Sequence, residues 1–94
     1  MIAISKPMLG PEEIAAVVAV MSSGNLVQGA KVAELEAAFA KLFGTSYAVA
    51  VNSGTAAIHC ALHAAGIGPG DEVIVPAFSF VGTVNPVLMV GARL

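Results

Sequence analysis

The sequence predicts an α/β fold, in which short strands alternate with helices around a mostly parallel sheet. Two short runs, residues 47–51 and 72–75, are mostly apolar and lack a helical period, which is typical of strands buried in a parallel sheet. Each run is followed by a segment that has the pattern of a helix. Because strand, helix, strand, helix with short turns is the α/β crossover pattern, we expect helices to cover both faces of the sheet.

The first predicted helix begins at Pro11 and is stopped by the Ser-Ser-Gly run at residues 22–24. Glu12 and Glu13 lie in its first turn, where the positive end of the helix dipole favours acidic side chains. One apolar face follows at helical spacing and consists of Ile14, Val17, Val18 and Met21. Residues 24–29 are then predicted to form a loop.

A second helix is predicted over residues 30–43, with Gly44 as its C-terminal cap. Its charged residues face water and its apolar residues form one stripe, the two sets being Lys31, Glu34 and Lys41, and Val32, Leu35, Phe39 and Leu42. We expect the apolar faces of both helices to make core or dimer contacts. Residues 47–51, with the sequence Tyr-Ala-Val-Ala-Val, follow as the first buried strand.

An Asn-Ser-Gly turn ends the first strand, and a third helix is predicted over residues 55–65. The Gly-Pro-Gly-Asp turn at residues 68–71 leads into the second strand. A fourth helix is predicted over residues 79–90, capped by the serine at its start and kinked at Pro86, whose ring removes one hydrogen bond and presses on the preceding turn. Residues 92–94 then begin a third strand.

The composition is too apolar for an ordinary domain of 94 residues, since 57% of the residues are hydrophobic, 11% are charged and the net charge is −2. A domain of this size hides only about 60–65% of its unfolded surface, and the rest needs a polar coat. Two charge-free runs, residues 42–70 and 73–92, are interrupted by Gly, Pro, Ser, Asn or His, which argues against a membrane-spanning helix. We therefore expect part of a larger protein.

Charge and cysteine content exclude further classes of protein. With four basic residues and a pI near 5.5, the chain lacks the basic surface that nucleic-acid binding needs. The segment Met1–Leu9 has no apolar stretch of the kind that marks a secretory signal. The single cysteine, Cys60, excludes an internal disulfide and agrees with a cytoplasmic location.

The sharpest local feature is the Asn-Ser-Gly-Thr-Ala-Ala turn at residues 52–57, between the first strand and the third helix. Free backbone N–H groups and the positive end of the helix dipole meet at such a turn, which makes it suitable for an anion. Gly54 permits close approach, and the hydroxyls of Ser53 and Thr55 can donate to phosphate oxygens. The alternative is that Ser53 only caps the helix. The spacing matches neither a P-loop nor a dinucleotide-binding fingerprint.

A second candidate segment, Pro-Ala-Phe-Ser-Phe-Val-Gly-Thr at residues 76–83, follows the second strand. Ligands of open parallel sheets bind outside the carboxyl ends of the strands, where this segment and the Ser-Gly-Thr turn would both lie. Phe78 and Phe80 can stack on a planar ring or belong to the core, and the core is the simpler interpretation.

The third helix carries a weaker candidate. His59 and His63 are one turn apart and can share a face, but no third ligand is evident, so we predict no metal site. Cys60, on the same helix, is interpreted as a small buried side chain.

The motifs occur in the order of one known family. They are Pro-Met-Leu-Gly-Pro-Glu-Glu at residues 7–13, the loop at 23–29, Val-Ala-Glu-Leu-Glu at 32–36, Asn-Ser-Gly-Thr-Ala-Ala at 52–57, Gly-Pro-Gly-Asp-Glu-Val-Ile at 68–74 and Phe-Ser-Phe at 78–80. Over essentially its whole length the chain resembles the N-terminal part of the DegT/DnrJ/EryC1/StrS family, the sugar aminotransferases that use pyridoxal 5′-phosphate (PLP).

This resemblance implies a fold and a set of cofactor-binding residues. The fold is the large domain of fold type I, which is aspartate-aminotransferase-like, in a homodimer with active sites at the subunit interface. Residues 1–94 would be the N-terminal portion of that domain, with a helix and loop over 1–29 and the start of the α/β core over 30–94. The residues implied to hold the cofactor are Ser53, Gly54, Thr55 and Ala56, around its phosphate, and Phe80, against its pyridine ring.

The resemblance also implies the reaction. An amino group would pass from glutamate, or sometimes glutamine, to a keto sugar carried on a nucleoside diphosphate, with the loop at residues 25–29 beside the sugar-nucleotide site. The family's Schiff-base lysine and its aspartate at the pyridine nitrogen belong to a region beyond Leu94, and Lys6, Lys31 and Lys41 do not match that lysine.

We therefore expect an N-terminal fragment of an enzyme of several hundred residues, with no catalytic residue of its own and inactive alone. Two alternatives stay open. One is a PLP-dependent sugar dehydratase of the same family, in which a histidine replaces the Schiff-base lysine. The other is a non-catalytic remnant or binding module.

Overall fold

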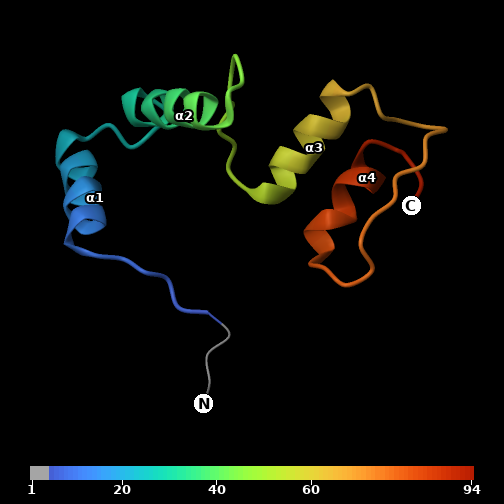
Figure 1. Ribbon diagram of the computed structural model, residues 1–94, viewed down its shortest axis with the longest axis horizontal. Helices are drawn as coiled ribbons and strands as arrows, with labels where there is room; N and C mark the ends of the chain where they lie inside the picture. Colours follow the sequence, from blue (N-terminus) through green and yellow to red (C-terminus); the bar gives the residue numbers. More distant parts are fainter. Residues whose placement is uncertain (1–4) are drawn as a thin grey trace.

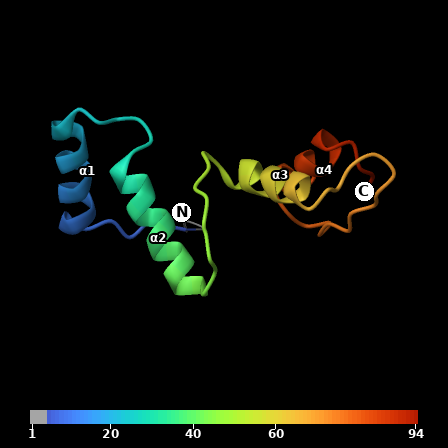
Figure 2. The same cartoon turned by 90° about the horizontal axis from the view of Figure 1, so that it is seen from above.

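A computed structural model describes residues 5–94 and contains, in that part of the chain, four α-helices and one 3₁₀ turn (Figure 1). The elements are α1 (Pro11–Ser23), α2 (Ala30–Phe43), α3 (Gly54–Ala64), η1 (Val81–Thr83) and α4 (Asn85–Met89). Their arrangement is open, with α1 and α2 on one side and α3 and α4 on the other (Figure 2). The radius of gyration is 17.4 Å, against about 12 Å for a compact domain of this length.

α1 begins and ends where the sequence predicts. Before its first turn, Oε2 of Glu13 accepts a hydrogen bond from the backbone N–H of Gly10 at 2.6 Å. At its end, Gly24 has a φ of 72°, and its N–H donates to the carbonyl of Met21 at 3.2 Å. No residue of α1 is buried. The first four residues of the predicted N-terminal segment lie outside the described part of the chain.

α2 also spans its predicted residues and ends at Gly44, whose φ of 66° lies in the left-handed region. Lys31 and Glu34 form an exposed ion pair at 2.6 Å. The rings of Phe39 and Phe43 lie 5.7 Å apart between centroids. No residue of α2 is buried, so the apolar faces of α1 and α2 have no core around them within residues 5–94.

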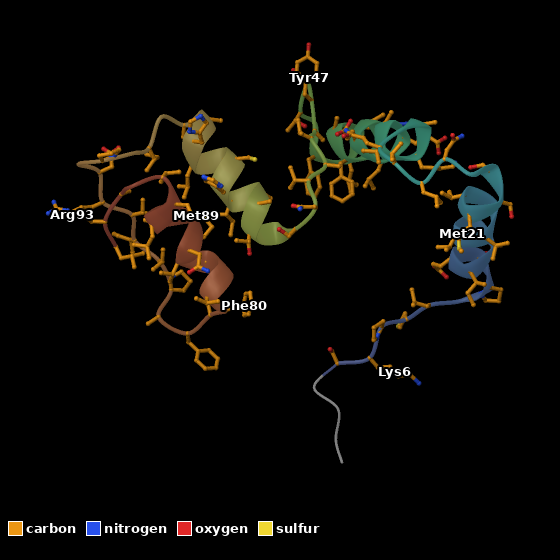
Figure 3. All side chains as sticks on the ribbon, turned by 180° about the vertical axis from the view of Figure 1, so that it is seen from behind. Lys6, Met21, Tyr47, Phe80, Met89 and Arg93 are labelled. Carbon is orange, nitrogen blue, oxygen red and sulfur yellow. The ribbon has the colours of Figure 1, made fainter. Side chains whose placement is uncertain are left out.

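The prediction of a buried strand over residues 47–51 is wrong for this structure. Tyr47 and Val49 are 87% and 80% exposed, and Tyr47 projects from the connection between α2 and α3 (Figure 3). A strand needs a neighbour that exchanges backbone hydrogen bonds with it. Within residues 5–94 no segment is paired with this run, so its larger apolar side chains, Tyr47, Val49 and Val51, stay exposed.

The second and third predicted strands meet in a single parallel bridge between Glu72 and Arg93. The N–H of Val73 donates to the carbonyl of Arg93, and the N–H of Arg93 donates to the carbonyl of Asp71, both at 2.9 Å. The side chains of Arg93 and Glu72 pair at 3.0 Å. The parallel direction agrees with the prediction, but this bridge is all that residues 5–94 show of the expected sheet.

The predicted fourth helix is divided into two elements. η1 is closed by bonds from Thr83 N to Phe80 O and from Val84 N to Val81 O, at 2.9 and 3.0 Å, and α4 starts only after it. Pro86 therefore lies in the first turn of α4, where its missing N–H costs no helical bond, and the predicted kink is not formed.

The buried core of the described residues lies between α3, η1 and α4. Val87 is 1% exposed and Ala92 is 5% exposed, and Pro86 and Gly82 are also buried. Gly91, which follows α4 and has a φ of 80°, lies against the 68–71 turn. A Cβ added to Gly91 would lie 3.1 Å from Cγ of the proline in that turn. Residues 54–94 are termed the C-terminal unit below, and residues 5–51 the N-terminal arm.

Among the described helices, none combines the length and the apolar character that a membrane crossing requires.

Candidate functional site

The predicted Ser-Gly-Thr turn forms the N-terminus of α3. Ser53 is its cap, because its backbone is extended and its Oγ accepts from the N–H of Ala56 at 3.1 Å. The first intrahelical bond runs from the N–H of Ala57 to the carbonyl of Ser53 at 3.0 Å. The N–H groups of Gly54 and Thr55 come before that bond and have no intrahelical acceptor. The capping role is thus confirmed, and it leaves two donors for a ligand.

The space in front of this turn is open. A Cβ built on Gly54 would meet no atom within 4 Å. Ser53 and Gly54 are exposed, whereas Thr55 and Ala56 are half-buried. Two outward-facing donors at the positive end of the α3 dipole suit an anion.

The second candidate segment reaches the same turn through Gly82. A Cβ on Gly82 would lie 2.5 Å from Oγ1 of Thr55 and 3.0 Å from Cδ1 of Phe80. Gly82 is buried, so its hydrogen is what allows the hydroxyl and the ring to approach the same point. The structure therefore brings Thr55 and Phe80 together although they are far apart in the sequence.

The two aromatic residues of this segment do not belong to the core of the described residues. Phe78 is 103% exposed and Phe80 is 77% exposed. Figure 3 shows Phe80 at the same end of the C-terminal unit as the N-terminus of α3. The ring of Phe80 is consequently open to a ligand held at that turn. Ser79, the predicted cap, instead places its hydroxyl 2.8 Å from that of Thr83.

Sequence reasoning missed two residues that shape this site, Gly82 and Glu36. Oε1 of Glu36 on α2 accepts a hydrogen bond from the N–H of Ala50, just ahead of the turn, at 2.8 Å. A glycine inside a predicted helix is a signal for Gly82, because it costs the helix about 1 kcal/mol and often has a packing reason. For Glu36 the sequence holds no such signal, since its partner is a backbone group.

The other candidate side chains do not belong to this turn. None of the three lysines belongs to the C-terminal unit, and one of them, Lys31, is paired with Glu34. Cys60 is exposed, so the prediction that it is buried is wrong. Within residues 5–94 no three His, Cys, Asp or Glu side chains gather around a possible metal position.

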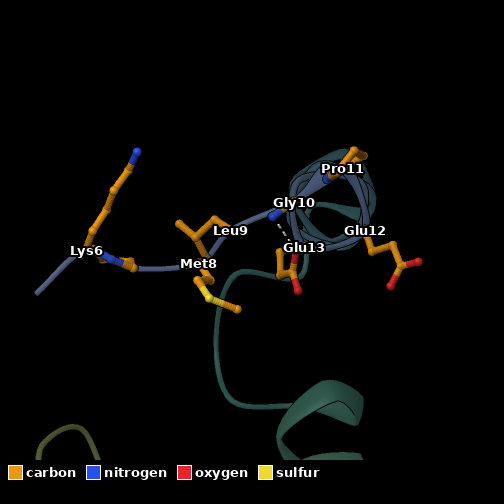
Figure 4. Close-up of a pocket in the computed structure, with 8 residues that line it drawn as sticks. Lys6, Met8, Leu9, Gly10, Pro11, Glu12 and Glu13 are labelled. Atoms are coloured by element: carbon orange, nitrogen blue, oxygen red, sulfur yellow. Dashed lines mark hydrogen bonds between the residues drawn. The ribbon is translucent and has the colours of Figure 1, made fainter.

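Two hollows lie in the N-terminal arm. One has a volume of about 760 Å³, is lined by residues 6–13 and contains no predicted site residue (Figure 4). The other has a volume of about 590 Å³ and lies between α1 and α2, with the loop at residues 25–29 in its wall. The loop at residues 25–29, which the family resemblance implies beside the sugar-nucleotide site, therefore lines a hollow in the N-terminal arm.

Comparison with known proteins identifies the family. A sequence model of the DegT/DnrJ/EryC1/StrS aminotransferase family matches residues 7–94. The chain belongs to this family. The family prediction made from the motifs is confirmed.

Solved aminotransferases contain the same arrangement of elements. The PLP-form of a protein from Streptococcus pneumoniae, described as a sugar aminotransferase, is 38% identical, with a TM-score of 0.88 over 98% of this chain and 24% of that chain. For TlmJ from Streptoalloteichus hindustanus the values are 38%, 0.81, 99% and 26%. For DesV of S. venezuelae, solved with a ketimine intermediate, they are 43%, 0.77, 87% and 22%. The chain spans about a quarter of the length of these proteins.

These relatives also bear on the cofactor and the fold. The S. pneumoniae protein has been solved in PLP, PMP and apo forms. The predicted cofactor, PLP, is therefore confirmed for the family. The structural likeness agrees with the predicted fold type I, whereas the parallel sheet is represented in residues 5–94 by the Glu72–Arg93 bridge alone.

Proposed function

We propose that this chain forms the phosphate-binding part of a PLP-dependent aminotransferase that transfers an amino group from glutamate to a nucleotide-linked keto sugar. Residues 1–94 form the N-terminal portion of its large domain, with a helix and loop over 1–29 and the start of the α/β core over 30–94. The whole enzyme acts as a cytoplasmic homodimer. Membership of a sugar aminotransferase family supports the reaction class.

One observation carries the cofactor part of the proposal, namely the meeting of Thr55 and Phe80 at Gly82. PLP has a phosphate group at one end and a flat aromatic ring. The N-terminus of α3 offers two backbone donors and the Thr55 hydroxyl to the phosphate. Phe80 offers an exposed aromatic face from the neighbouring segment. The residues present therefore fit both parts of this cofactor.

Each residue of the turn has a distinct part in holding the phosphate. Ser53 fixes the first turn of α3 through Ala56, so that the N–H groups of Gly54 and Thr55 keep their direction. Because the Ser53 oxygen accepts from Ala56, its own O–H stays free to donate to the phosphate. Because the N–H of Ala56 donates to Ser53, Ala56 contributes mainly by holding Ser53 and not by donating to the phosphate.

PLP, when bound, supplies the electron sink that stabilises negative charge at the reacting carbon. The contribution of this chain is binding and orientation. Phe80 confines the flat ring and does not compete for its nitrogen. Lys31 and Lys41 belong to α2 and Lys6 precedes α1, and none of the three matches the family's Schiff-base lysine, so we expect residues 1–94 alone to be inactive.

The cofactor proposal is tested on the protein expressed from the complete reading frame. We expect bound PLP to give a visible absorption band that borohydride abolishes. Thr55→Ala should raise the dissociation constant of PLP about tenfold, because one hydrogen bond to a charged phosphate is lost. Thr45→Ala is the matched control, since the hydroxyl of Thr45 bonds to the carbonyl of Tyr47 in the arm. A colourless protein that takes up no PLP would refute the proposal.

The substrate proposal is tested on the same protein loaded with PMP. A keto sugar on a nucleoside diphosphate should accept the amino group, and the free keto sugar should react far more slowly. Glutamate should then regenerate the amine faster than glutamine does. Turnover that is independent of the nucleotide would refute the substrate class.

A further inference from the structure

Within the N-terminal arm, a side chain of α2 is bonded to the segment that leads into the candidate site. Oε1 of Glu36, in the middle of α2, accepts from the backbone N–H of Ala50 at 2.8 Å. Both residues are half-buried. The other charged contact of α2, between Lys31 and Glu34, stays within the helix. The Glu36 bond instead links α2 to the segment that leads into the turn before α3.

This bond matters because the segment has little else to fix it. Residues 47–51 are paired with no strand in the described part of the chain, and Tyr47 and Val49 are largely exposed. A hydrogen bond to a carboxylate is roughly twice as strong as one between neutral groups. Ala50 precedes the cap Ser53 by a stretch of chain that spans about 10 Å when extended. A fixed Ala50 therefore restricts where the cap and the first turn of α3 can lie.

We propose that Glu36 is a positioning residue for the phosphate turn, which it holds through Ala50 without touching the ligand. This inference rests on the proposed function, because it assigns the turn to the cofactor phosphate. What is needed of Glu36 is an acceptor oxygen at the right reach, and its negative charge strengthens that acceptor. A glutamine keeps the oxygen and the reach, whereas an aspartate keeps the charge and falls short by one methylene.

The experiment compares Glu36→Ala, Glu36→Gln and Glu36→Asp in the protein from the complete reading frame, with PLP as the probe. The control is Glu34→Ala, on the same helix, since Glu34 is exposed and contacts only Lys31 among the charged groups of α2. Two quantities are measured, namely hydrogen–deuterium exchange of the peptide covering residues 45–53 and the dissociation constant of PLP. Thermal unfolding of each variant reports whether it folds.

Glu36→Ala and Glu36→Asp should speed exchange in that peptide and raise the dissociation constant about tenfold. Glu36→Gln should restore both to within about threefold of the unmodified protein, and Glu34→Ala should change neither. If Glu36→Ala does not fold, the aspartate and glutamine variants give the same contrast.

Equal weakening by all three Glu36 variants would overturn the proposal, because it would show a general disturbance of α2. An unchanged dissociation constant in Glu36→Ala would also overturn it. If the unmodified protein bound no PLP, the proposed function would fail, while slower exchange in Glu36→Gln than in Glu36→Ala would still establish that Glu36 holds Ala50.

Discussion

The N-terminal arm and the C-terminal unit obey the same local rules of helix formation, but only the C-terminal unit buries side chains. α1 and α2 end at glycines in the left-handed region and have their predicted bounds, yet neither contains a buried residue. The short elements η1 and α4 enclose Val87, Pro86 and Gly82 together with α3. Local signals thus decide where a helix begins and ends, and burial depends on segments that are distant in the sequence.

The largest effect on the difference between the two regions is expected when a charge is placed in the buried core of the C-terminal unit. In the 94-residue chain, Val87→Asp puts a carboxylate at a residue that is 1% exposed. Burying an unpaired carboxylate costs several kcal/mol, on the order of 3 or more. We expect the amides of α4 to lose their protection from hydrogen exchange, as measured by NMR.

The matched control is Val17→Asp on α1, where the valine is 58% exposed. An exposed substitution of this kind changes stability by about 0.5 kcal/mol or less. We expect the exchange of α4 amides to stay as it is in the unmodified chain. Protection of α4 that survives Val87→Asp would show that the unit has no cooperative core.

A smaller difference in stability is expected from substitutions at two glycines that have similar backbone angles, one in each region. Gly24 ends α1 at φ 72° with no atom within 4 Å of an added Cβ, whereas at Gly91 the φ is 80° and the Cβ would lie 3.1 Å from Cγ of Pro69. Left-handed strain costs about 1–2 kcal/mol for a residue with a Cβ. Gly91→Ala adds crowding to that strain, so we expect a loss of about 2 kcal/mol or more in the C-terminal unit.

For Gly24→Ala we expect about 1 kcal/mol, confined to the end of α1. Exchange protection of α4 and the helix content of α1 measure the two effects separately. Equal losses would mean that the contact between residue 91 and Pro69 adds nothing to the strain.

A third change tests how the unit shapes the candidate site. Gly82→Val places a branched side chain where even a Cβ would lie 2.5 Å from the Thr55 hydroxyl. The hydroxyl has to move, so the protein from the complete reading frame should bind PLP about tenfold more weakly, equivalent to ~1.4 kcal/mol. Gly68→Ala serves as the control, because a Cβ there would lie 3.6 Å from its nearest neighbour. Unchanged affinity in Gly82→Val would remove Gly82 from the site.

The same contrast explains which parts of the fold could be predicted. The bounds of α1 and α2 follow from proline, acidic residues and glycine within a few positions of each end. The strand over residues 47–51 is predicted from its apolar character and its lack of a helical period, but a strand also depends on its neighbour. The prediction of one helix over residues 79–90 is wrong for a local reason, because Pro86 suits the first turn of a helix better than its interior.

The parts of the candidate site that lie within a single turn of the chain could be predicted from the sequence. The Ser53 cap and the open donors of Gly54 and Thr55 follow from the residue order at the N-terminus of α3. The approach of Thr55 to Phe80 and the bond from Glu36 to Ala50 are set by tertiary contacts. Such contacts leave no periodic pattern in the sequence.

The smallest expected effect concerns the start of α1. The backbone N–H of Gly10 donates to Glu13 and, with the N–H of Glu13 itself, lowers the pKa of this carboxyl below its ordinary value of 4.5. A carboxyl with a lowered pKa in the folded state stabilises that state above its unfolded pKa, and the contribution disappears as the pH falls through the folded value. The helix content of α1, measured by NMR chemical shifts in the 94-residue chain, should therefore decrease slightly when the pH is lowered below 4.5.

Glu13→Gln should flatten this pH dependence and Glu12→Gln should retain it, because the hydrogen bond to Gly10 belongs to Glu13. An identical pH profile in the two variants would assign the effect to the helix dipole acting on both carboxylates, and not to the bond at Gly10.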